Sequence, residues 1–112
     1  MPHIIIEHSH NGLATEPEKV LNKLHQSLIE IDLFKPANIK LRLHPVMDFL
    51  LDDRLRGFIH IQCRTHSGKS MEQKSLLSET LVKAMKGICS ENCVITCEIV
   101  EMDSVSYAKT LT

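Results

Sequence analysis

The chain has 112 residues, of which 43% are hydrophobic and 24% charged, and its formal net charge at pH 7 is −1. This length accommodates a single small domain (residues 1–112), and the apolar fraction is that of a folded protein and not of a disordered segment. The near-zero net charge gives no bulk attraction to nucleic acid or to an anionic membrane, and a chain with no Trp and one Tyr lacks a base-stacking platform.

The first half of the chain reads as a strand, a helix and a second strand. Residues 2–8 are rich in Ile and predict a strand, and Asn11-Gly12 marks a turn. Thr15 to Glu18 resembles a capping box with an early proline, and the helix that follows should end before Pro36. Residues 38–46 alternate between apolar and polar, which predicts a half-buried strand. The helix has apolar residues at helical spacing: Val20, Leu21, Leu24, Leu28 and Ile31.

The second half repeats this order. Residues 58–64 predict a strand, residues 66–69 a loop, and Ser70 with Gln73 a capping box that opens a helix. Residues 94–102 predict the last strand, before a short polar tail. The apolar face of the second helix is expected to contain Leu76, Leu77, Leu81, Ala84, Met85 and Ile88. The chain is therefore predicted to be an α+β protein, a tandem β-α-β repeat whose two helices cover one face of a four-stranded sheet.

A single layer of helices leaves the other sheet face open, and that face is chemically mixed. Lys40, Arg42 and His44 alternate with the aliphatic residues of their strand, and His60 and Arg64 do so on the strand of the second half. Such a surface suits a subunit interface or a ligand site better than bulk water. An oligomer is therefore expected.

Pro2 is the first candidate for chemistry. Removal of the initiator Met would make it the amino terminus, with a secondary amine at the start of a strand. A free α-amino group titrates near ~8, and burial or nearby cations lower its pKa further, which suits a base that abstracts a proton next to a carbonyl. The alternative is that Pro2 is only the residue that follows Met1.

Three cations are candidate ligands for an anionic substrate. Lys40 and Arg42 are two residues apart on one strand, and Lys69 lies in a glycine loop before a helix N-terminus, where anions are favoured; Arg64 is a further cation. The alternative is that they are solvated surface charges. Gly68-Lys69-Ser70 resembles the end of a phosphate-binding loop, but Cys63 stands where that loop needs its first glycine.

No metal site or cofactor is predicted. The cysteines (63, 89, 93 and 97) lack the paired spacing of a zinc site, and the pairs His8 with His10 and His44 with His60 have no accompanying carboxylate motif. The cysteines are expected to be reduced structural thiols in a cytoplasmic protein, since no signal peptide or membrane-spanning run is recognisable.

The chain resembles the tautomerase superfamily, and within it the 5-carboxymethyl-2-hydroxymuconate isomerase family. The likeness spans nearly the whole chain in short motifs. These are Pro2-His3-Ile4-Ile5-Ile6-Glu7 with Ser9, Leu33-Phe34-Lys35-Pro36 with Ile39, Arg42 with His44, Phe58 with His60, Gly68-Lys69-Ser70-Met71-Glu72, and Glu98-Ile99 with Glu101.

The resemblance implies a homotrimer with a central barrel of three sheets, and a cofactor-free 1,3-keto–enol tautomerisation of an unsaturated polycarboxylic acid from aromatic-compound catabolism. Pro2 would be the catalytic base and acid, and Lys40, Arg42 and Lys69 would bind the substrate. Lys40 and Lys69 stand where the family has functional arginines, whereas Arg42 is retained. Charge is kept at the two changed positions, but the planar guanidinium that grips a carboxylate with two hydrogen bonds is not.

Two other functions fit the same sequence. One keeps Pro2 as acid or base in the hydration or dehalogenation of a small unsaturated acid. The other is a non-enzymatic ferredoxin-like module that binds a small ligand, because that fold has the same order of elements.

Overall fold

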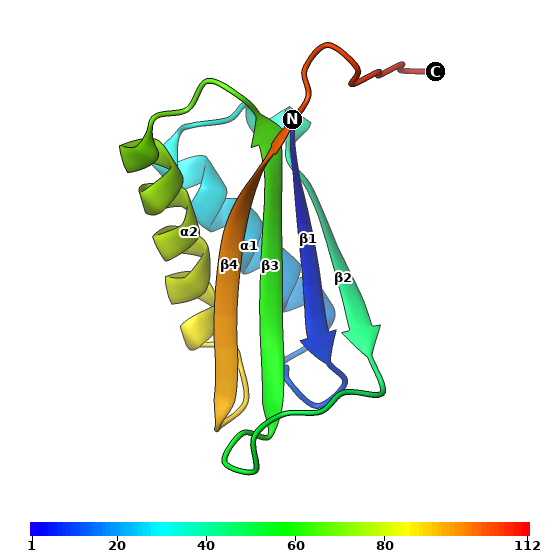
Figure 1. Ribbon diagram of the computed structural model, residues 1–112, viewed down its shortest axis with the longest axis vertical. Helices are drawn as coiled ribbons and strands as arrows, with labels where there is room; N and C mark the ends of the chain where they lie inside the picture. Colours follow the sequence, from blue (N-terminus) through cyan, green and yellow to red (C-terminus); the bar gives the residue numbers. More distant parts are fainter.

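Four strands form one mixed sheet, and two helices lie side by side on one of its faces (Figure 1). The computed structural model describes residues 1–112. The strand order is β2-β1-β3-β4, in which β1 is parallel to β2, β3 is parallel to β4, and β1 and β3 are antiparallel. This confirms the predicted α+β fold. The elements are β1 (Pro2–Ser9), α1 (Pro17–Ile31), a short 3-10 helix η1 (Pro36–Asn38), β2 (Lys40–Val46), β3 (Gly57–His66), α2 (Met71–Lys86) and β4 (Cys93–Met102).

Strand register assigns each side chain to one of the two faces. Ile4 and Ile6 of β1 pair with Leu41 and Leu43 of β2, and these residues point toward the helices. The core beneath the helices is aliphatic, since Ile4, Ile6 and four leucines of the helices are completely buried. Those leucines come from both helices: Leu24, Leu28, Leu77 and Leu81.

The open face carries the polar set that the alternation predicts. His3 lies between Lys40 on β2 and Arg64 on β3, and Glu7 lies between His44 and His60. His44 and His60, considered above as a possible metal-binding pair, therefore do not lie on neighbouring strands, because β1 separates them. No three His, Cys, Asp or Glu side chains lie close enough together to hold a metal ion.

The two helices begin differently. Ser70 caps α2: its hydroxyl accepts from the Gln73 backbone N–H at 3.1 Å while the Gln73 side chain accepts from the Ser70 N–H at 2.9 Å. That capping box is the predicted one. The one expected at Thr15 is wrong, because Glu16 is the N-cap and makes no side-chain cap bond. Pro17 at the first helical turn has no N–H that needs a partner, so the helix begins there without a cap.

Other details also depart from the predicted ones. Residues 36–38 turn in η1 before β2 begins, and β3 extends through Thr65 to His66 instead of ending at residue 64. Leu76 is 46% exposed and lies outside the core, although it has helical spacing with the buried leucines.

The four cysteines are free thiols. Burial raises the pKa of Cys63 to about 12 and that of Cys97 to about 12, and the pKa of Cys93 is raised to about 11, mainly by burial and also by the neighbouring Cys89. These three thiols are therefore protonated at neutral pH and cannot act as nucleophiles. Neither helix has the length and apolar character that a membrane crossing requires.

Candidate active site

Five segments meet at one end of the sheet. Because β2 is parallel to β1, its first residue lies beside the chain's N-terminus, and the antiparallel β3 finishes at the same end of the sheet. The loop from β3 to α2 and the tail that follows β4 start from this end as well (Figure 1). Residues distant in sequence are thus gathered around the amino terminus.

A cavity of about 560 Å³ opens at this end. Its lining combines the N-terminal residue with apolar side chains, polar side chains and lysines. The lining residues used below are Met1, Phe34, Thr65, His66, Lys69, Ser104, Tyr107 and Lys109. A second hollow of about 490 Å³ lies between α2 and β4, but the only thiol in it is the protonated Cys97.

The terminal amine of this chain belongs to Met1, and Pro2 behind it is fully buried. The pKa of the Met1 amine is lowered from its usual value near 8.0, first by burial and then by the positive charges of Lys40, Lys109 and Lys69. The surroundings of the N-terminus therefore favour a neutral amine, which is the form that accepts a proton.

Lys40 reaches this site from the start of β2. Its Nζ lies 3.8 Å from the Sδ of Met1 and donates to the carbonyl of Asn38 at 3.1 Å. The carbonyl comes from the end of η1, so the turn before β2 holds the ammonium beside the N-terminus.

Lys69 reaches the site from the loop between β3 and α2. Gly68 before it has φ +115°, a conformation that favours glycine. The Lys69 Nζ lies 4.5 Å from the centroid of the Phe34 ring and donates to the hydroxyl of Thr65 at 3.4 Å. The ammonium group therefore rests on an aromatic face at the wall of the cavity.

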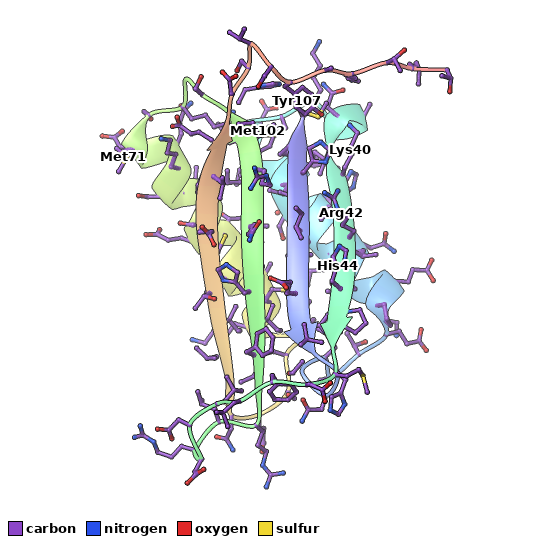
Figure 2. The ribbon with its side chains drawn as sticks, turned by 45° about the vertical axis from the view of Figure 1, so that its right-hand side comes forward. Lys40, Arg42, His44, Met71, Met102 and Tyr107 are labelled. Carbon is purple, nitrogen blue, oxygen red and sulfur yellow. The ribbon has the colours of Figure 1, made fainter.

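Arg42 is placed differently from the two lysines. It lies two residues beyond Lys40 on β2, on the open face (Figure 2). It does not line the cavity; its Nη1 instead donates to the Nδ1 of His3 at 3.2 Å. The pKa of His3 is lowered, first by burial and then by the charges of Arg42 and Lys40, so His3 is neutral near pH 7. The structure thus brings Lys40 and Lys69 close to the Met1 amine, whereas Arg42 contacts the nearby His3.

The sequence reasoning missed the contribution of the C-terminal tail. Tyr107 donates from its hydroxyl to the Sδ of Met1 at 2.8 Å, and its hydroxyl lies 2.9 Å from the Nε2 of His3. Lys109 adds a third positive charge near the amine. A lone tyrosine in an otherwise polar tail was the only signal available, and no periodicity accompanies it.

Comparison with known proteins agrees with the fold and identifies the family. The profile of the 5-carboxymethyl-2-hydroxymuconate isomerase family matches residues 2–110. The chain belongs to this family. Its members are isomerases, so this protein is an isomerase of the tautomerase type and not the non-enzymatic ligand-binding module considered above.

Solved structures share the fold at low sequence identity. A 5-carboxymethyl-2-hydroxymuconate isomerase from Deinococcus radiodurans R1 is 22% identical, with a TM-score of 0.79 over 99% of this chain and 90% of that one. A 5-carboxymethyl-2-hydroxymuconate delta-isomerase is 14% identical, with a TM-score of 0.77 over 100% and 89%. A "W0 fused 4-OT wild type symmetric trimer" is 13% identical, with a TM-score of 0.69 over 95% and 93%. No curated protein sequence matches the chain significantly.

Proposed function

We propose that the mature protein begins at Pro2 and catalyses a 1,3-keto–enol tautomerisation with the proline nitrogen as base and acid. The substrate class is 5-carboxymethyl-2-hydroxymuconate or a similar unsaturated 2-hydroxy or 2-oxo polycarboxylic acid. The observation that carries the proposal is the N-terminal amine, held beside a cavity with three lysines close enough to lower its pKa.

The reaction moves one proton and the conjugated double bonds. The neutral secondary amine of Pro2 takes the proton of the substrate's hydroxyl, and the electron pair flows through the conjugated system. The resulting ammonium returns the proton to a distal carbon of that system, so substrate and product have the same atoms and oxidation state. The pKa of the Met1 amine is lowered by burial and by adjacent cations, and a terminal amine at Pro2 would be subject to the same two effects, which suit a base that works near neutral pH.

The lysines supply the charge that the substrate requires. Lys40 and Lys69 would bind carboxylates and stabilise the negative charge that develops on the dienolate oxygen. Lys109 adds a third cation at the rim. Because lysine is a point charge and not a planar fork, the site is expected to accept a wider range of carboxylate positions than an arginine pair would.

We extend the proposal to a homotrimer. The open face of the sheet carries apolar residues, among them Ile5, Phe58 and Val94, as well as unlike charges. Three sheets closed into a barrel would cover these residues and pair the charges. A solved structure of the same fold is described as a symmetric trimer, which agrees with this arrangement.

The proposal also covers the metabolic role and the cellular compartment of the protein. Acids of this kind arise in aromatic-compound catabolism, and four unpaired thiols suit the reducing cytoplasm. Hydration or dehalogenation by the same proline is the second reaction to test, because it needs the same amine and the same cations.

The test compares untagged protein with the same chain carrying a short N-terminal extension, which turns the Pro2 nitrogen into an amide. Untagged protein should tautomerise members of a panel of 2-hydroxymuconate-type acids and phenylenolpyruvate, and the extended chain should lose this activity while its thermal midpoint is unchanged. Full activity of the extended chain would exclude Pro2 as the base. Halide release or water addition without tautomerisation would select the second reaction.

A further inference from the structure

A chain of three side chains runs from β2 across β1 to the N-terminal cavity. Arg42 Nη1 is 3.2 Å from His3 Nδ1, and His3 Nε2 is 2.9 Å from the hydroxyl of Tyr107. We propose that Tyr107 is a catalytic hydrogen-bond donor to the substrate oxygen that is deprotonated by Pro2, and that His3 and Arg42 are positioning residues that aim its hydroxyl. The inference rests on the proposed function.

The chemistry of the three groups fixes the direction of the hydrogen bonds. A guanidinium can only donate, so the Nδ1 of His3 must accept. Neutral His3 then carries its proton on Nε2 and donates it to the Tyr107 oxygen. The pKa of His3 is lowered by burial and by Arg42, which agrees with the neutral form. The hydrogen of Tyr107 is therefore free to point away from His3.

That hydrogen points to Met1, whose sulfur stands in for a substrate acceptor. The Tyr107 hydroxyl donates to Met1 Sδ at 2.8 Å, and the Nζ of Lys40 lies 3.8 Å from the same sulfur. Loss of Met1 would leave a hydroxyl and an ammonium directed at one volume in front of Pro2. A substrate oxygen placed there would accept from both, and Tyr107 would stabilise its developing charge without giving up its own proton.

The tail holds Tyr107 in a defined place. Tyr107 is half-buried, while the residues on either side of it are exposed. Its backbone N–H donates to the carbonyl of Asp103 at 3.1 Å, and the ring packs edge-on against His66 with centroids 5.1 Å apart. The hydroxyl is thus positioned by a turn, a ring contact and His3 together.

The test is kinetic and uses untagged full-length protein with phenylenolpyruvate. Tyr107→Phe keeps the ring and removes the donor, so kcat should fall about a hundredfold with KM changed less than about twofold, as for loss of one oxyanion donor. Thr110→Val removes an exposed tail hydroxyl and should leave both constants unchanged.

The positioning residues are tested by rescue. His3→Ala should lower kcat as Tyr107→Phe does, and His3→Gln should recover most of it, because the Gln amide can donate at the place of Nε2. When Tyr107 is already replaced by Phe, His3→Ala should lower kcat no further. Arg42→Ala should lower kcat much less in that background than in the otherwise unchanged chain. Equal effects of these substitutions in both backgrounds would overturn the relay.

Failure of this inference can be told from failure of the proposed function. Normal kcat in Tyr107→Phe, with an inactive N-terminally extended chain, would refute the donor and leave Pro2 in place. If the extended chain is active, ligand contact is read from fluorescence, because Tyr107 is the only tyrosine and the chain has no Trp. A saturable change in tyrosine fluorescence on titration with 2-oxoadipate would then support Tyr107 as a ligand contact. Unchanged fluorescence would overturn that role for Tyr107.

Discussion

Replacing Lys69 by Met tests whether positive charge at the cavity wall drives turnover. Methionine keeps the unbranched stem that packs on Phe34 but removes the ammonium that lies 4.5 Å from the ring centroid. The substitution therefore separates charge from packing. Lys69 is half-buried and has no carboxylate partner, since the only side-chain acceptor within reach is the Thr65 hydroxyl. Its charge is thus available to a substrate.

The expected magnitude is that of an ion pair between the Lys69 ammonium group and a substrate carboxylate. Two unit charges about 4 Å apart interact by about 4 kcal/mol at an effective dielectric constant of about 20, and exposure to solvent lowers this value. A loss of about 2–4 kcal/mol of transition-state stabilisation corresponds to a decrease in kcat/KM of roughly thirty- to a thousandfold. Lys40→Ala should produce a decrease in the same range.

The assay is the change in absorbance of the conjugated acid, measured with untagged protein. Lys83→Ala is the control, because Lys83 is exposed on α2 and lies outside the cavity. Lys69→Arg with Lys40→Arg should raise kcat/KM for a substrate with several carboxylates, since the guanidinium restores two-point binding. If Lys69→Met keeps full activity while blocking Pro2 abolishes it, another cation binds the substrate, and Arg42 or Arg64 would be tested next.

Four further predictions concern the whole chain. Intact mass spectrometry should show a protein that begins at Pro2, and a dominant species that retains Met1 would contradict the mechanism. Light scattering at micromolar concentration should give a trimer, and a monomer would exclude the barrel. The pH profile of kcat/KM should have an ascending limb with a pKa below about 8, because only the neutral amine is a base. Lys40→Met should move this ascending limb to higher pH, since removal of a cation favours the protonated amine. Ser70→Ala removes the capping box and should lower the free energy of unfolding by about 1 kcal/mol, measured with urea, whereas an unchanged midpoint would show that the cap contributes nothing.

The elements governed by local pattern were predictable from the sequence. Strict alternation placed Lys40 and Arg42 on the open face, and the spacing of Ser70 and Gln73 identified the start of α2. The start of α1 was not, because Thr15 and Glu18 have the spacing of a capping box, whereas the helix begins at Pro17, with Glu16 as an N-cap that makes no side-chain bond.

The site was predictable only where a local sequence pattern marks its residues. The cations at Lys40 and Lys69 could be inferred from a face and a loop, and the structure places both near the amine. The contact between His3 and Tyr107 joins residues 104 positions apart, and no pattern along the chain encodes it. The environment of Arg42 could not be predicted for the same reason, because its face was evident but its partner His3 was not.

The C-terminal tail contributes to the active-site cavity and not to the core that stabilises the fold. Residues 103–112 contribute nothing to the buried core, yet they bring a hydroxyl and an ammonium group to the rim of the cavity. Substitutions in such a segment can alter which acid is accepted without weakening the packing of the sheet against its helices. A library confined to these ten positions would therefore sample substrate preference at constant folding stability, and it offers a direct route to re-targeting the enzyme.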